Sequence, residues 1–137
     1  MSINQSNGKG TGYLTVRVST ALGAIPLDKA SVNIRGSTPE TSGIVYSLQS
    51  DRDGLTERVA LPTPSLYASA APDRGVPYSM WSIDIFREGY SPVYLERVPV
   101  YPSVTSVQSV AMVPLPEGFA PQRVYVEARP TDNKEEA

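Results

Sequence analysis

The thirteen prolines of this chain constrain its fold more than any other feature of the sequence. They are spread from Pro26 to Pro130, so few windows of helical length lack one. A proline inside a helix removes a backbone donor and clashes with the preceding turn. Between the prolines lie short runs rich in Val, Ile, Tyr and Thr, in which apolar and polar residues alternate. A period of two is typical of half-buried strands, so the sequence predicts an all-β domain.

Seven of these runs are long enough to be strands, and turn signals separate them. That spacing predicts a Greek-key β-sandwich of seven to eight strands, transthyretin-like or Ig-like. Within one run Trp81, Ile83 and Ile85 fall on the same face, so we expect them in the core. The predicted strands are residues 13–19, 30–35, 44–50, 55–61, 78–86, 90–100 and 104–115.

The pattern does not decide which side chains of the last run, residues 104–115, face the core. Val110 and Met112 compete with Val107 and Val113 for the core, and a β-bulge could serve both pairs.

Two connections between the runs differ in character. Residues 51–54 read Asp-Arg-Asp-Gly and predict a tight turn, with a positive φ at the glycine, that joins runs 44–50 and 55–61 into a hairpin. Residues 62–77 show no periodicity, and a structureless connection of that length is often functional. The predicted organisation is a flexible tail over residues 1–11, the sandwich over 12–116, and an extension over 117–137 that ends in a polar tail.

Composition excludes several classes of function. The chain has no Cys and no His, which removes thiol nucleophiles, Ser-His catalysis and the usual zinc ligands. Its net charge of -2 at pH 7 lacks the basic excess that nucleic acid binding requires. We therefore expect no cofactor and no nucleic acid partner.

The sequence also bears on location. The first twelve residues are polar and unlike a signal peptide, and no apolar run is long enough to span a membrane. We expect a chain that is cytoplasmic as synthesised, with a spore, virion or cell-surface assembly left open as its destination.

Three short motifs carry a family resemblance. They are Leu22-Gly23-Ala24-Ile25-Pro26-Leu27 with Ala30-Ser31-Val32, Ser50-Asp51-Arg52-Asp53-Gly54 leading to Leu61-Pro62, and Arg87-Glu88-Gly89-Tyr90-Ser91-Pro92. Over residues 12–116 the chain resembles the carboxypeptidase regulatory-like, transthyretin-like family of β-sandwiches. The resemblance implies a non-catalytic folding, spacer or adhesion module. The chain departs from the family at Lys29, where a glycine is usual, and in its long loop. It also lacks an Asn in the last strand, so the Lys-Asn isopeptide of the family's collagen-adhesin relatives is not expected.

The acidic residues give two weak candidate sites. Asp51, Asp53 and Glu57 begin like a calcium loop, but Pro62 stands where the bidentate Glu should be, so a plain turn is the favoured interpretation. Asp84 and Glu88 are the nearest approach to a catalytic carboxylate pair, yet Asp84 falls on the solvent face of its run.

Two further candidates concern binding. Tyr67 and Tyr101 are the tyrosines most suited to exposed ring contacts with a sugar or a protein. Residues 122–127 form a possible eighth strand, in which Arg123, Val124, Tyr125, Val126 and Glu127 could pair within the chain or with a second chain.

The leading hypothesis is therefore a non-enzymatic structural or protein-interaction module of a bacterial or phage assembly, with a protein partner or self-association. A carbohydrate- or cell-wall-binding domain is the alternative, and an auxiliary enzyme subunit is the third possibility.

Overall fold

The strongest alternation in the sequence becomes the central strand of the structure, β1 (Lys9–Thr20). Leu14, Val16 and Val18 have no exposed surface, as their spacing predicts. The strand begins at Lys9, inside the predicted flexible tail, because residues 9–14 pair with a later strand.

The computed structural model describes residues 9–65, 78–116 and 124–127, and within these ranges it contains no α-helix. The predicted all-β sandwich is confirmed. No helix in the described part of the chain is long and apolar enough to cross a membrane. The elements after β1 are a 3-10 turn η2 (Ala21–Gly23), β2 (Ile25–Pro26), β3 (Ser31–Gly36), β4 (Val45–Gln49), β5 (Val59–Pro64), β6 (Ser79–Phe86), β7 (Val93–Val100), β8 (Thr105–Ala111) and β9 (Val124–Glu127).

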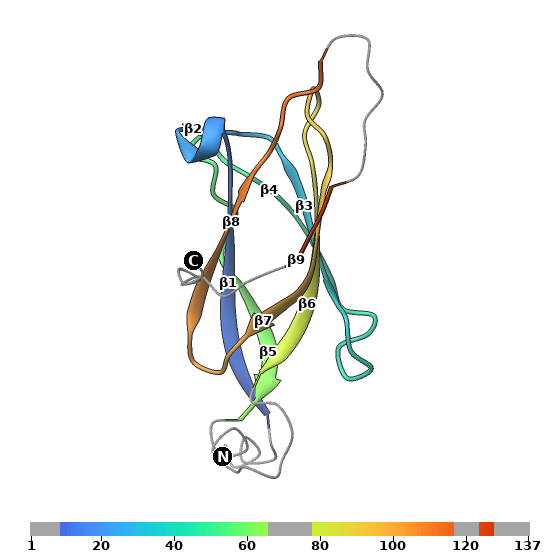
Figure 1. Cartoon of the computed structure of the whole chain (residues 1–137). Coiled ribbons are helices and arrows are strands. Elements are labelled where there is room, and N and C mark those ends of the chain that lie inside the picture. The colour runs from blue at the N-terminus through green and yellow to red at the C-terminus, as the bar shows by residue number, and fades with distance from the viewer. Residues whose placement is uncertain (1–8, 66–77, 117–123, 128–137) are drawn as a thin grey trace.

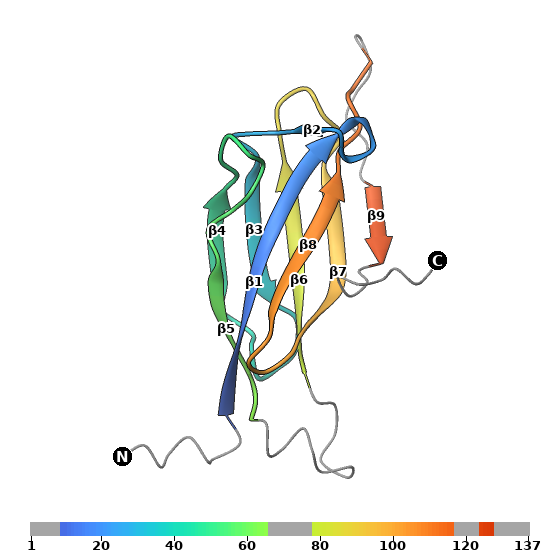
Figure 2. The same ribbon diagram turned by 90° about the vertical axis from the view of Figure 1, so that its left-hand side faces the viewer.

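Two sheets pack face to face (Figure 1). In the first sheet β1 pairs antiparallel with β2 and β5, and parallel with β8. The second sheet has the order β4-β3-β6-β7-β9. Figure 2 shows β1 and β8 side by side in front of the second sheet. The core lies between the sheets.

Trp81 is a central core residue, as its place in the sequence pattern predicts. Its side chain is fully buried together with Ile83 and Ile85 on β6. The indole Nε1 donates a hydrogen bond to Ser79 Oγ at 2.8 Å, so the one polar atom of this ring has a partner. A buried indole with its N–H paired is typical of a structural residue.

The predicted hairpin between runs 44–50 and 55–61 is wrong. The Asp51–Gly54 turn exists, with Gly54 at φ 81°, but it carries the chain from one sheet to the other. Within the described ranges β4 pairs with β3 alone, whereas the Thr56 N–H donates to the Val16 carbonyl at 2.9 Å and so joins β1. The alternation in a strand specifies which face is buried but not which neighbour supplies the hydrogen bonds.

The fourth strand also runs further than predicted. β5 extends through Pro62 to Pro64, into the segment expected to be loop, and Thr63 is buried. Two prolines are compatible with this strand because β5 is an edge strand, where their missing N–H groups need no partner.

A β-bulge occurs in β7 rather than in β8. The register between β6 and β7 shifts between Trp81 and Ile83, and Arg97 has φ 64°. Leu95 and Val98 are three positions apart, so in a regular strand they would lie on opposite faces. The extra residue allows both of them to face the core. β8 pairs with β1 without interruption, with Val110 and Met112 inward; Val107 and Val113 are exposed.

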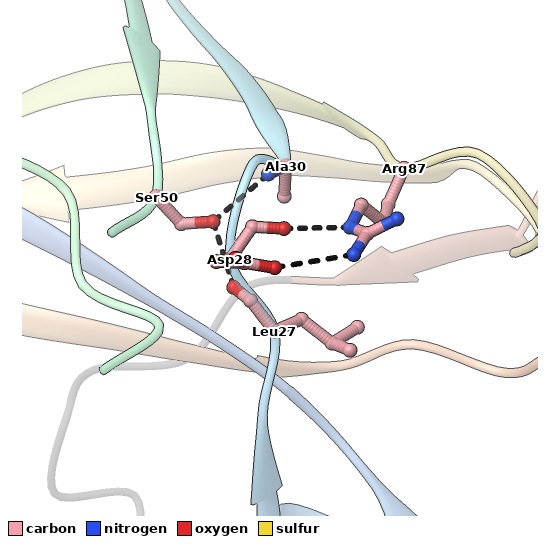
Figure 3. Close-up of polar contacts among 5 residues, drawn as sticks. All are labelled: Leu27, Asp28, Ala30, Ser50 and Arg87. Carbon is pink, nitrogen blue, oxygen red and sulfur yellow. Dashed lines mark hydrogen bonds and ion pairs between the residues drawn. The ribbon is translucent and has the colours of Figure 1, made fainter. Parts of the chain in front are cut away.

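A cluster of polar contacts ties the start of β3 to its neighbours (Figure 3). Ser50 Oγ accepts a hydrogen bond from Ala30 N–H at 2.9 Å and donates one to the Leu27 carbonyl at 2.7 Å. Arg87 Nε donates to the Asp28 carbonyl at 2.6 Å, and its NH2 group contacts the Asp28 carboxylate at 3.2 Å. Residues of all three sequence motifs therefore meet here, and their contacts stabilise the fold.

Candidate interaction surface

Among the residues that the structure describes, no strand pairs with the outer edge of β8. Tyr13 N–H donates to the Val104 carbonyl at 2.9 Å, and Met112 N–H donates to the Ser19 carbonyl at 2.7 Å. Even-numbered residues of β8 therefore direct their backbone groups toward β1. Because these directions alternate along a parallel ladder, the N–H and C=O groups of the odd-numbered residues point away from β1. Within the described residues no second strand pairs with β8, so four positions face outward: Thr105, Val107, Ser109 and Ala111.

The opposite edge of the same sheet is protected. Pro62 lies opposite Thr11 and Pro64 opposite Lys9, at positions whose nitrogen points away from β1. These two residues have no N–H to offer an incoming strand. The carbonyl of Ala60, which faces the same way, accepts a hydrogen bond from Tyr46 Oη at 3.2 Å. Prolines and an engaged carbonyl are devices by which natural sheets prevent added pairing.

β8 has fewer of these devices, because every one of its outward-facing positions keeps its N–H group. The whole segment 98–116 contains no charged residue, and β8 itself contains no proline and no bulge. An uncharged edge strand without interruption is a template for pairing with another chain. One side chain does reach this edge: Gln108 Nε2 donates a hydrogen bond to the Ser109 carbonyl at 3.3 Å.

Exposed apolar side chains gather around this edge. Seven large hydrophobic residues in the described ranges are exposed. Val107 lies on β8, Val104 and Val113 flank it, and Leu22 lies on η2, which contacts β8. We call β8 with Val104, Val113 and Leu22 the open-edge surface.

Leu22 is presented on a strained turn. Its side chain is 98% exposed, and both Ala21 and Leu22 have a positive φ, at 53° and 57°. Left-handed backbone costs a non-glycine residue about 1–2 kcal/mol. The turn is anchored because Thr20 Oγ1 donates to the Met112 carbonyl at 2.9 Å. Strain that displays an apolar side chain is often found where a protein binds a partner.

The structure describes only some of the binding residues that the sequence suggested. Tyr67 and Arg123 lie outside the described residues. Tyr101 is half-buried rather than exposed, and its ring packs on Tyr78 with centroids 5.1 Å apart. Sequence reasoning missed Tyr78. Residues 124–127 form β9, which pairs parallel with β7 of the same chain.

The acidic candidates take part in local structure. Asp51 Oδ1 accepts hydrogen bonds from the N–H groups of Asp53 at 2.8 Å and Leu55 at 3.0 Å, which is the pattern of an Asx turn. Among the described residues no three Asp, Glu, His or Cys side chains are grouped so as to hold a metal ion. The carboxylate of Asp84 accepts two hydrogen bonds from Arg35, at 2.9 and 2.7 Å, on the outer face of the second sheet.

The open-edge surface was not identified from the sequence, although one signal pointed to it. The absence of charge over residues 98–116 is visible in the sequence. What the sequence does not show is that β8 pairs on one side only, because partner choice depends on contacts between distant segments.

Comparisons with known proteins support the fold. No protein-family model and no curated protein sequence matches this chain. Similar solved structures include the Bacillus anthracis TIE protein, at 13% identity and a TM-score of 0.52 over 77% of this chain. Catechol 1,2-dioxygenase of Acinetobacter radioresistens has 10% identity and a TM-score of 0.55 over 92% of this chain. The minor pilin of Streptococcus agalactiae is matched at 14% identity with a TM-score of 0.46 over 85% of this chain.

These likenesses are partial. The chain spans 17% of the length of the TIE protein, 60% of the dioxygenase and 50% of the pilin. At such low identity the matches to the TIE protein and the dioxygenase, with TM-scores above 0.5, show a shared fold alone.

Proposed function

We propose that this chain is a non-catalytic structural module that joins a protein assembly by accepting an added strand at β8. The observation that carries the proposal is the open-edge surface. Four outward-facing backbone positions lie on an uncharged strand, with exposed valines on and beside it. Main-chain hydrogen bonds along such an edge provide affinity, and alternate side chains select the register.

The chemistry of the chain supports a non-catalytic role. It has no His or Cys, the side chains that most often act as acid, base or nucleophile near neutral pH. Of the two carboxylates considered from the sequence, Asp84 forms an ion pair with Arg35, and Glu88 is exposed in the turn that follows β6. Substrate turnover that is lost in both Asp84→Asn and Glu88→Gln, with the fold intact, would contradict this part of the proposal.

We also infer kinship with the carboxypeptidase regulatory-like family. Lys29 stands where that family usually has glycine, and its φ of 59° is a conformation that favours glycine. Gly54, in the Asp-Arg-Asp-Gly turn, has φ 81°. A bacterial or phage assembly is part of this proposal, and the TIE protein and the dioxygenase, each matched with a TM-score above 0.5, come from bacteria.

The proposal is tested by placing a photocrosslinking amino acid at Val107 in the native host. The matched control places the same residue at Val45, an exposed valine on the edge strand of the other sheet. We expect a specific protein adduct from position 107 and none from position 45. The absence of an adduct at 107, or the same adducts from both positions, would count against an interaction through β8.

A further inference from the structure

We infer that the strand accepted at β8 is the β8 of a second copy of this chain, paired antiparallel and centred on Gln108. This inference rests on the proposed function and names its partner. The outward-facing positions of β8 are 105, 107, 109 and 111, which are symmetric about residue 108. An antiparallel pair of identical strands with this centre therefore sets every outward-facing residue of one copy against an outward-facing residue of the other.

This register follows from the count of hydrogen-bonding positions. Centring the pair on Gln108 places Thr105 opposite Ala111 of the second copy and Val107 opposite Ser109. Both pairs occur twice because of the two-fold symmetry, so all four outward positions are used. Centring on Val107 or on Ser109 leaves one of them beyond the paired region, so the register on Gln108 forms more main-chain hydrogen bonds.

The side chains suit contact between identical strands. Since residues 98–116 carry no charge, no like charges meet when two copies of β8 approach each other. Val104, which is 44% exposed, would lie opposite Met112 of the second copy. Val107, 39% exposed, would have Val107 of the second copy as a diagonal neighbour on the outer face.

Gln108 has a particular place in this arrangement. It is half-buried on the inward face, and its amide covers the Ser109 carbonyl, which is one of the outward-facing acceptors. In the paired state that carbonyl accepts an N–H from Val107 of the second copy. The amide of Gln108 is then free to hydrogen-bond the amide of its symmetry mate, which lies directly opposite in a non-hydrogen-bonded pair where side chains approach most closely.

The test uses two double variants with opposite charge patterns. In the Gln108-centred register, position 107 of each copy lies opposite position 109 of the other. V107K/S109K therefore places two lysines opposite each other at both of these pairs, and V107K/S109E places a lysine opposite a glutamate at both. We expect the unaltered chain to dimerise as concentration rises in analytical ultracentrifugation. V107K/S109K should weaken the dimer by roughly tenfold or more, and V107K/S109E should restore it to within a few fold.

Comparing the two variants also distinguishes the Gln108-centred register from its neighbours. Centred on Val107 or on Ser109, both variants would set like charges against each other, so both would weaken association. Both altered residues are exposed, and equal thermal midpoints in dilute solution, where every chain is monomeric, verify that the fold is kept. Comparable weakening by the two variants, or no weakening by either, would overturn the register that we infer.

The outcomes separate the two claims. A chain that stays monomeric across about two decades of concentration overturns self-pairing. If position 107 still forms a photoadduct with a different protein, the proposed function stands while the second copy is excluded. If the chain is monomeric and position 107 forms no adduct, both claims fail.

Discussion

The hydroxyl of Ser50 donates a hydrogen bond to the carbonyl of Leu27 at 2.7 Å, linking the end of β4 to the segment before β3. The same oxygen accepts the N–H of Ala30 at 2.9 Å, and Ser50 is only 4% exposed. One buried hydroxyl therefore satisfies two backbone groups where the chain has no strand partner to do so.

Replacing Ser50 by alanine should therefore destabilise the protein by about 1–3 kcal/mol, because a buried donor and a buried acceptor lose their partner. Urea denaturation followed by circular dichroism measures the change. Ser47→Ala, at an exposed position of β4, is the control and should have little effect. Equal stability of the Ser50 and Ser47 variants would show that the hydroxyl contributes nothing.

Lys29 offers a stabilising substitution. It is exposed and has φ 59°, a conformation that costs a side-chain-bearing residue about 1–2 kcal/mol. Lys29→Gly removes this cost but adds backbone freedom to the unfolded chain, so a net gain of about 0.5–1 kcal/mol is expected. Lys29→Ala keeps the Cβ atom and should give no comparable gain. A lower free energy of unfolding in Lys29→Gly than in Lys29→Ala would contradict the strain argument.

Trp81 provides both a probe and a test of the core. It is the only tryptophan and is fully buried, so the folded protein should have a blue-shifted emission maximum. Trp81→Ala should cost about 3–5 kcal/mol of stability, as expected for a large core residue. Phe86→Ala, at a partly exposed position on the same strand, should cost less. An emission maximum in the native state that matches the unfolded state would be incompatible with this core.

The ion pair of Arg35 and Asp84 should contribute little. Its side chains are 49% and 16% exposed on the outer face of the second sheet, although the Asp84 carboxylate accepts two hydrogen bonds. A double-mutant cycle with alanine at both positions should give a coupling of up to about 1 kcal/mol, decreasing with added salt. A coupling well above this range that did not change with salt would indicate a pair more isolated from solvent than the structure shows.

How far the sequence predicts this fold depends on whether a feature is local. The alternation of Leu14, Val16 and Val18 predicts a strand and its buried face, and the structure agrees. The Asp51 turn is likewise local and was predicted. The sheet to which residues 55–61 belong was not predicted correctly, because a strand of either sheet would show the same alternation.

The bulge at Arg97 and the inward face of β8 could not be predicted from the sequence, for a related reason. Both depend on how one strand is aligned with another, and a shift of one residue exchanges the buried and exposed faces. The open edge of β8 is a property of the whole sheet, since it exists only where no other strand pairs. Its lack of charge could be read from the sequence, whereas its position at an edge could not.

The most direct test of the central claim is residue-resolved amide hydrogen exchange along β8 of the unaltered chain. In dilute solution, the amides of Thr105, Val107, Ser109 and Ala111 should exchange at least about tenfold faster than those of Ser106, Gln108 and Val110, which are bonded to β1. At high concentration the four outward amides should become protected, because the second copy then bonds them. Outward amides that are already protected in dilute solution, or that remain unprotected in the associated state, would contradict an interaction through this edge.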